Sequence, residues 1–90
     1  MRQIWVVDDD RSIRWVLEKA LTRAQMPFRL FESAADVVKA FERDTPSVLL
    51  SDIRMHDMSG LDLLAFVKNK YPGLPVIIMT AFSDLDSAVR

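Results

Sequence analysis

Residues 4–10 read IWVVDDD, an apolar run of four residues that ends in three consecutive acids, Asp8, Asp9 and Asp10. The run is short and continuously apolar, which is typical of a parallel strand buried on both faces. Three carboxylates at the end of such a strand oppose folding, because like charges a few ångströms apart repel one another. Clustered acids at this point therefore indicate a functional site.

Two later apolar runs also end in polar side chains. Residues 48–50 are soon followed by Asp52, and residues 76–79 are followed directly by Thr80. If these runs form parallel strands beside the first, their carboxyl ends gather at one edge of the sheet, where open α/β folds bind ligands. Carboxylates are hard oxygen ligands that suit Mg²⁺, and a carboxylate can also attack phosphorus as a nucleophile. The sequence therefore predicts a magnesium and phosphoryl site, in which Thr80 donates its hydroxyl to a phosphoryl oxygen.

The composition bounds the class of protein. The 90 residues allow one small domain, residues 1–90, and half of them are hydrophobic, so we expect a packed core. Twelve basic and 13 acidic residues nearly cancel, which gives no reason to expect a nucleic-acid or membrane partner. The chain has no cysteine and one histidine, His56, which excludes disulfides and metal clusters built from these residues. The N-terminal apolar run is too short for a signal peptide or a membrane span, so we expect a cytoplasmic protein.

Expected strands and helices alternate along the whole chain. Short apolar runs alternate with segments whose apolar residues recur at helical spacing, which is the pattern of an α/β fold. Such a chain forms a doubly wound parallel sheet with right-handed crossovers, a three-layer sandwich. The basic residue Arg29 favours an edge position for its strand. The expected strands are residues 3–7, 28–31, 48–50 and 76–79, and the expected helices are residues 11–24, 34–43, 60–70 and 84 onward.

Serine marks the start of three of the expected helices. Ser33, Ser59 and Ser83 each stand three residues before an aspartate, which is a weak form of the capping box. The first helix has two candidate caps, Asp10 and Ser12. For Asp10 the capping role competes with a role as a metal ligand, and the sequence leaves this choice open.

Three segments together resemble the receiver domains of two-component response regulators, in particular the NtrC-like receivers of nitrogen regulators. The resemblance covers the whole chain in order, and the segments are jointly far more specific than any one of them. The three segments are residues 6–10 (VVDDD), 52–60 (DIRMHDMSG) and 75–81 (PVIIMTA), and residues 12–18 (SIRWVLE) and 83–89 (SDLDSAV) strengthen the likeness.

This resemblance implies a flavodoxin-like fold and a role for each residue of the site. Asp52 would be the phosphoacceptor. Asp8 and Asp9 would bind Mg²⁺ together with Asp52 and the backbone carbonyl of Arg54. Thr80 would be the switch hydroxyl, which moves toward the phosphoryl group and couples it to the helix that begins near residue 84.

The resemblance also implies partners. A sensor histidine kinase or a small phosphodonor would supply the phosphoryl group. The receiver would not be an enzyme in the ordinary sense, because it would catalyse only its own phosphorylation and dephosphorylation. Transcription would be controlled through downstream output domains that lie outside this chain.

Two features depart from the family pattern. His56 stands where NtrC-like receivers usually carry proline, and we interpret it as a tolerated change and not as a ligand. A receiver also needs a fifth strand, which ends in a lysine that pairs with the phosphoryl group, and a fifth helix. The chain ends at Arg90 before either, and Lys68 and Lys70 lie on the third helix instead. We therefore expect the strand at 76–80 to be an exposed edge, so that the chain tends to dimerise, swap or aggregate. We also expect it to accept phosphate slowly, because the lysine that would neutralise the phosphoryl oxygens is absent.

Two other functions fit part of the pattern. A haloacid-dehalogenase-like phosphatase would use Asp8 as its nucleophile and a strand ending in Thr80, but it gives Asp52 no role. A receiver-like binding module would act through contacts alone, without accepting phosphate. Beryllofluoride with Mg²⁺ would separate the three: we expect a response through Asp52 in a receiver, through Asp8 in a phosphatase, and none in a binding module.

Overall fold

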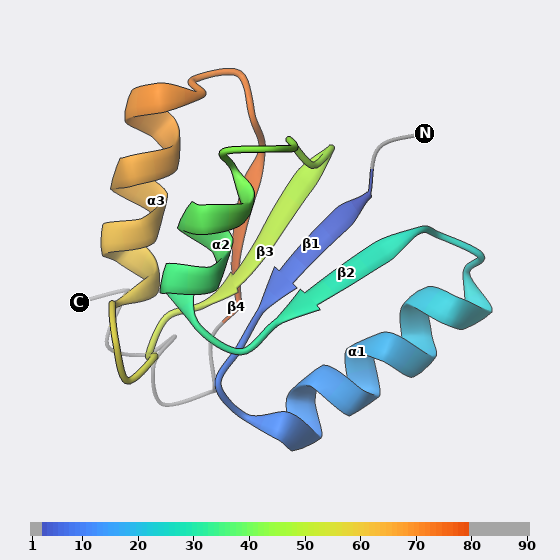
Figure 1. Cartoon of the computed structure of the whole chain (residues 1–90). Coiled ribbons are helices and arrows are strands. Elements are labelled where there is room, and N and C mark those ends of the chain that lie inside the picture. The colour runs from blue at the N-terminus through green and yellow to red at the C-terminus, as the bar shows by residue number, and fades with distance from the viewer. Residues whose placement is uncertain (1–2, 80–90) are drawn as a thin grey trace.

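The computed structural model describes residues 3–79, and within that range the chain forms four strands and three helices (Figure 1). The alternation of strands and helices predicted from the sequence is confirmed over these residues. Thr80 and the helix expected from residue 84 lie outside them. The strands are β1 (Ile4–Val7), β2 (Phe28–Phe31), β3 (Val48–Asp52) and β4 (Val76–Met79), and the helices are α1 (Arg11–Arg23), α2 (Ala34–Ala40) and α3 (Gly60–Lys70).

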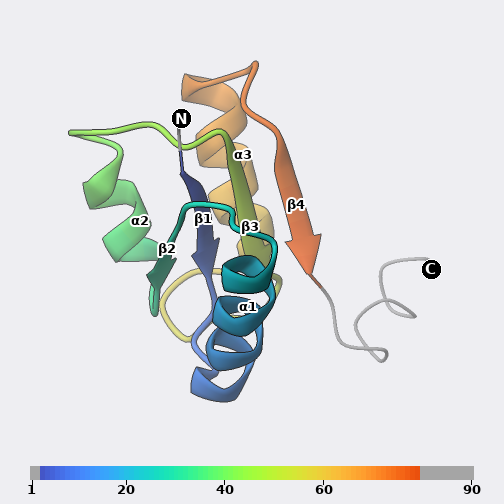
Figure 2. The same ribbon diagram turned by 90° about the vertical axis from the view of Figure 1, so that its right-hand side faces the viewer.

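All four strands are parallel and lie in the order β2-β1-β3-β4. Figure 2 shows β2 and β4 at opposite edges of the sheet, with β1 and β3 between them. The edge position predicted for β2 from Arg29 is confirmed. Val7 at the end of β1 pairs with Ser51, so the acids that follow β1 lie beside Asp52 at the end of β3.

One face of the sheet carries most of the core. Helices α2 and α3 cover this face, and α1 lies on the other (Figure 1). Trp5 in β1 is fully buried, and its ring meets Phe31 and Phe41 at centroid distances of 5.2 and 4.9 Å. Burial of one large apolar side chain of this kind contributes about 1.5–3 kcal/mol. The other core residues are Val7, Ala34, Val37, Leu49, Leu63, Val67 and Leu74.

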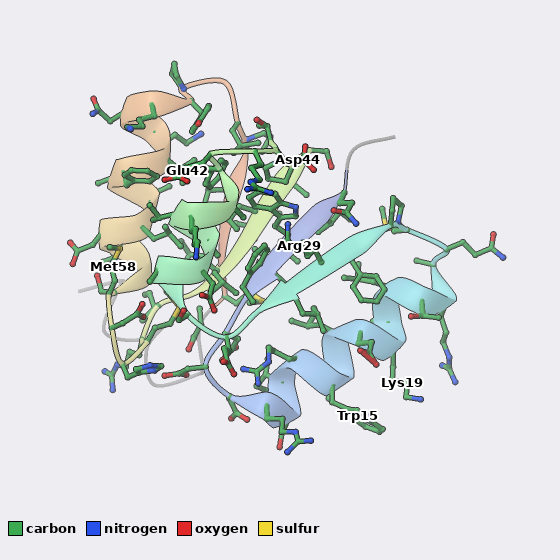
Figure 3. All side chains as sticks on the ribbon, in the orientation of Figure 1. Trp15, Lys19, Arg29, Glu42, Asp44 and Met58 are labelled. Atoms are coloured by element: carbon green, nitrogen blue, oxygen red, sulfur yellow. The ribbon has the colours of Figure 1, made fainter. Side chains whose placement is uncertain are left out.

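Helix α1 packs less closely than the other two. None of its side chains is buried, although its apolar residues recur at helical spacing. Ile13 and Val16 remain 42% and 54% exposed, because α1 is the one described helix on its face of the sheet. Trp15 points away from the sheet, and the Lys19 ammonium lies 5.4 Å from its ring centroid (Figure 3).

The described helices begin at caps that the sequence offered. In each case a side-chain oxygen accepts a hydrogen bond from a backbone N–H of the first turn, which satisfies one donor that has no partner within the helix. Asp10 accepts from Ser12 at 2.8 Å, Ser33 accepts from Asp36 at 3.2 Å, and Ser59 accepts from Asp62 at 3.1 Å.

Two helix ends differ from the predicted ones. Helix α2 ends at Ala40, because residues 41–43 form a turn, so the predicted end at residue 43 is wrong. Helix α1 ends at Arg23, one residue before the predicted end at residue 24. The chain leaves the helix through Gln25, which has a left-handed φ of 57° although it is not a glycine. The N–H of Met26 then donates to the carbonyl of Leu21 at 3.1 Å, which is the bond that ends a helix in the Schellman motif.

Candidate metal and phosphoryl site

The carboxylates of Asp8, Asp9 and Asp52 come together at the carboxyl ends of β1 and β3. One carboxylate oxygen from each residue lies within 4.8 Å of the other two. Asp8 is 3% exposed, whereas Asp9 is exposed and Asp52 is half-buried. The sequence predicted that these acids meet, and the register between β1 and β3 brings them together.

Each of the three carboxylates accepts a hydrogen bond from a backbone N–H. The Oδ1 atom of Asp8 accepts from the N–H two residues later at 2.8 Å, and Oδ1 of Asp52 accepts from the next N–H at 2.9 Å. The Oδ2 atom of Asp9 accepts from the N–H of His56 at 3.1 Å. Because a carboxylate offers about four lone-pair sites, these bonds orient the groups and still allow each of them to bind a cation.

The electrostatics of the cluster favour a cation. Burial raises the pKa of Asp8 above its ordinary value, and the hydrogen bond from Asp10 opposes this rise. The charges of Asp52, Asp9 and Asp10 then raise the pKa further. A divalent cation would relieve this repulsion, and a set of carboxylate oxygens is the donor chemistry that Mg²⁺ prefers. The residues present therefore fit a magnesium ion.

Asp10 acts as the N-cap of α1. Its Oδ1 accepts from Ser12, and it is not one of the three acids whose oxygens converge. The geometry therefore favours the capping role over the ligand role that the sequence left open. The guanidinium of Arg14 donates to the backbone carbonyl of Asp8, which ties the first turn of α1 to the end of β1.

Gly60 brings the start of α3 against the backbone of Asp52. Its N–H donates to the carbonyl of Ile53 at 2.6 Å. A Cβ atom at Gly60 would lie only 2.0 Å from the carbonyl oxygen of Asp52, so a residue without a side chain is required for this approach.

Arg54, whose carbonyl the resemblance implies as a metal ligand, follows two residues after Asp52 and is exposed.

The loop of residues 53–59, called here the β3–α3 loop, contains two contacts that the sequence did not predict. One is the bond from His56 to Asp9. The other is made by Asp57, whose carboxylate accepts from the N–H groups of Ala34 at 3.3 Å and Ala35 at 2.9 Å. Desolvation alone would raise the pKa of Asp57, but the hydrogen bonds from the N–H groups of Ala35, Ala34 and Asp57 itself, together with the charge of His56, hold the pKa below its ordinary value. The loop is thus fastened both to the acid cluster and to the N-terminus of α2.

The chain belongs to the response regulator receiver domain family, whose model matches residues 4–90. Within that family it is NtrC-like. It is 66% identical over 87 residues to the DNA-binding transcriptional regulator NtrC of Proteus hauseri, and 60% identical over 86 residues to NtrC of Escherichia coli K12. These matches cover 97% and 96% of this chain but 18% of each relative, so the chain spans about a fifth of their length.

Solved receiver structures share the fold. The BeF₃-activated receiver domain of nitrogen regulatory protein C is 57% identical, with a TM-score of 0.79 over 99% of this chain and 73% of that one. Its apo form is 58% identical, with a TM-score of 0.83 over 98% and 71%. The response regulator TrrA of Thermotoga maritima, solved with Mg²⁺ and BeF, is 29% identical, with a TM-score of 0.87 over 97% and 76%. These likenesses confirm the predicted flavodoxin-like fold.

The described residues contain no candidate for a membrane span. Within residues 3–79 no helix combines the length and the apolar character that crossing a bilayer requires.

Proposed function

We propose that this chain is the phosphoacceptor receiver of a two-component response regulator. Asp52 accepts the phosphoryl group, and Asp8, Asp9, Asp52 and the backbone carbonyl of Arg54 hold Mg²⁺. The observation that carries the proposal is the convergence of three carboxylates within 4.8 Å, at the ligand-binding edge of a receiver-type sheet. The proposed donor is a phosphohistidine of a sensor histidine kinase, and the proposed output is control of transcription.

Asp52 is suited to act as the nucleophile. It ends β3, it is half-buried, and the N–H of Ile53 orients its carboxylate. One carboxylate oxygen forms the new O–P bond while the N–P bond of the phosphohistidine breaks, and the departing imidazole nitrogen takes a proton. Mg²⁺ at this site supplies the positive charge that neutralises the oxygens of the transferring group. The carboxylates of Asp8 and Asp9 accept hydrogen bonds from the backbone N–H groups of Asp10 and His56, which orient them.

The geometry favours Asp52 over Asp8 as the nucleophile. Asp8 is 3% exposed and its pKa is raised, so a phosphatase that uses Asp8 would start from a shielded carboxyl group. The family match also leaves the haloacid-dehalogenase-like function without support. Thr80 enters the proposal as the switch hydroxyl on the strength of the resemblance alone.

Amide chemical shifts on addition of beryllofluoride and Mg²⁺ test the proposal. This reagent pair is bound in the structure of the similar Thermotoga maritima regulator. A mimic of the phosphoryl group at Asp52 adds charge and acceptor atoms beside the acid cluster. We therefore expect the shifts to concentrate at residues 8–10, 52–60 and 80–89.

Two variants sharpen this experiment. Asp52→Asn should abolish the shifts, whereas Asp62→Asn, which changes an exposed acid of α3, should leave them as in the parent protein. Shifts confined to residues 34–43 would contradict the assignment of Asp52. A parent protein that does not respond at all would identify a binding module that no longer accepts phosphate.

A further inference from the structure

The guanidinium of Arg14 donates a hydrogen bond to the backbone carbonyl of Asp8. Strand β1 ends at Val7, and Asp8, the next residue, is 3% exposed. The N–H of Asp8 still pairs with β2, because it donates to the carbonyl of Phe31 at 3.1 Å. The carbonyl of Asp8 instead receives a charged donor from α1. Since a buried carbonyl without a partner costs free energy, Arg14 satisfies a group that lies just beyond the end of the strand.

This carbonyl belongs to the peptide that joins the two acids proposed to bind Mg²⁺. The C=O of Asp8 and the N–H of Asp9 lie in one plane, because the peptide bond has partial double-bond character. The orientation of this plane sets ψ of Asp8 and φ of Asp9, and with them the directions of the two side chains relative to one another. A donor that holds the carbonyl therefore acts on both carboxylates at once.

Arg14 is itself held by the first turn of α1. Its N–H donates to the carbonyl of Asp10 at 3.1 Å, and the carboxylate of Asp10 caps the helix by accepting from Ser12 at 2.8 Å. Arg14 is half-buried, so its guanidinium extends from a fixed backbone toward the end of β1. Arg11 begins the same turn, but it is exposed, and its side chain makes no hydrogen bond or ion pair within residues 3–79. The turn thus carries two arginines, of which one contacts the acidic segment.

We propose that Arg14 is a positioning residue of the cation site, which orients the carboxylates of Asp8 and Asp9 through the peptide between them. This inference rests on the function proposed above, in which both acids are ligands of Mg²⁺. The loss of a group that orients metal ligands from outside typically lowers metal affinity about 10- to 100-fold. Because Arg14 contacts a backbone atom and not a ligand atom, we expect a loss of about 10-fold, at the lower end of this range.

Calorimetric titration with Mg²⁺ of the parent protein, Arg14→Met and Arg11→Met separates positioning from an effect of charge. Both substitutions keep a long side chain with good helix propensity and remove one positive charge near the acid cluster. The loss of this charge alone would strengthen Mg²⁺ binding, by about twofold at physiological ionic strength. We expect Arg11→Met to show this small gain, and Arg14→Met to bind Mg²⁺ about 10-fold more weakly than the parent protein. Equal affinities for the two variants would overturn the inference.

A titration well below the thermal midpoint of each variant separates positioning from a general loss of stability. A variant that is less stable but still fully folded keeps its affinity for Mg²⁺ unless the site itself has changed. An Arg14→Met protein with a lowered midpoint and the affinity of the parent would therefore overturn the inference and leave the proposed function in place. A parent protein that does not bind Mg²⁺ would overturn both.

The hydrogen bond can also be measured without the methionine variant, should that protein fail to fold. Arg14→Lys keeps the charge but replaces the planar guanidinium by an ammonium group on a shorter side chain. In the metal-free protein we expect the carbonyl ¹³C resonance of Asp8 and the amide ¹⁵N resonance of Asp9 to move on Arg14→Lys and to stay in place on Arg11→Lys. Resonances that ignore Arg14→Lys would contradict the proposed role, whatever the Mg²⁺ affinity.

Discussion

Gly60 determines how closely the start of α3 approaches the candidate phosphoacceptor. We predict that Gly60→Ala lowers the thermal midpoint, because the new Cβ would lie 2.0 Å from the carbonyl oxygen of Asp52 and the backbone must move. Overpacking of this kind costs about 1–3 kcal/mol. Gly73→Ala is the matched control, since a Cβ there meets nothing within 4 Å, and it should change stability by no more than about 0.5 kcal/mol. Equal midpoints for the two variants would contradict the close approach.

At the residue scale the sequence was sufficient to predict which side chains form the site, but not which backbone N–H groups donate to them. Asp8, Asp9 and Asp52 could be predicted to meet, because each follows an apolar run that reads as a strand. The contacts of His56 and Asp57 could not be predicted, because they depend on the path of a loop that tertiary packing sets. The interpretation of His56 as a tolerated change and not as a ligand stays a prediction, because its hydrogen bond to Asp9 is made by the backbone N–H and not by the imidazole.

The N-terminus of α2 is capped in part by an acid from another part of the chain. The N–H groups of its first two residues donate to Asp57 of the β3–α3 loop, and the third donates to Ser33, its own cap. The sequence predicted the serine, because a cap is a local signal, and it could not predict the acid from 22 residues away. Helix α2 is short, so these caps matter more to it than to a longer helix.

We predict that Asp57→Ala destabilises the protein by about 1 kcal/mol at neutral pH, as the loss of a helix cap does. Asp57→Asn keeps an acceptor oxygen and should cost less. The pKa of Asp57 is lower in the folded than in the unfolded protein, so its negative charge stabilises the fold. This stabilisation is complete above the ordinary Asp pKa of about 3.9, and it is lost as the pH falls through the lowered pKa.

The free energy of unfolding, measured by chemical denaturation from about pH 2 to about pH 7, checks this prediction. The stability of the parent protein should fall more steeply below about pH 4 than that of Asp57→Asn. Glu42→Gln removes an exposed acid in the turn after α2 and serves as the control, with the slope of the parent protein. Parallel curves for the parent and Asp57→Asn would contradict the capping role.

At the scale of the whole molecule, the alternation of strands and helices was sufficient to predict a parallel α/β sheet. The burial of α1 was not predictable in the same way. Its apolar residues have helical spacing, yet Ile13 and Val16 stay exposed, because burial depends on which other elements cover the same face of the sheet. The packing of Trp5 against Phe31 and Phe41 likewise depends on elements that only the fold brings together.

Metal binding should be visible in the stability of the whole molecule. We predict that millimolar Mg²⁺ raises the thermal midpoint, because it binds the folded acid cluster and not the unfolded chain; at a hundred times the Kd the gain is about 2.7 kcal/mol, or on the order of 10 °C. Asp9→Asn should raise the midpoint of the metal-free protein by relieving repulsion, and it should reduce the gain from Mg²⁺. Identical midpoints with and without Mg²⁺ in both proteins would rule out the metal site.

The identity of the phosphorylated residue tests the central claim most directly. The protein is incubated with a small phosphodonor with and without Mg²⁺, the acyl phosphate is trapped by borohydride reduction, and the modified residue is located by peptide mass spectrometry. We predict that the modification depends on Mg²⁺ and falls on Asp52 alone, and that Asp52→Asn abolishes it. Modification of Asp8 or Asp9 in the parent protein, or none at any residue, would contradict the account.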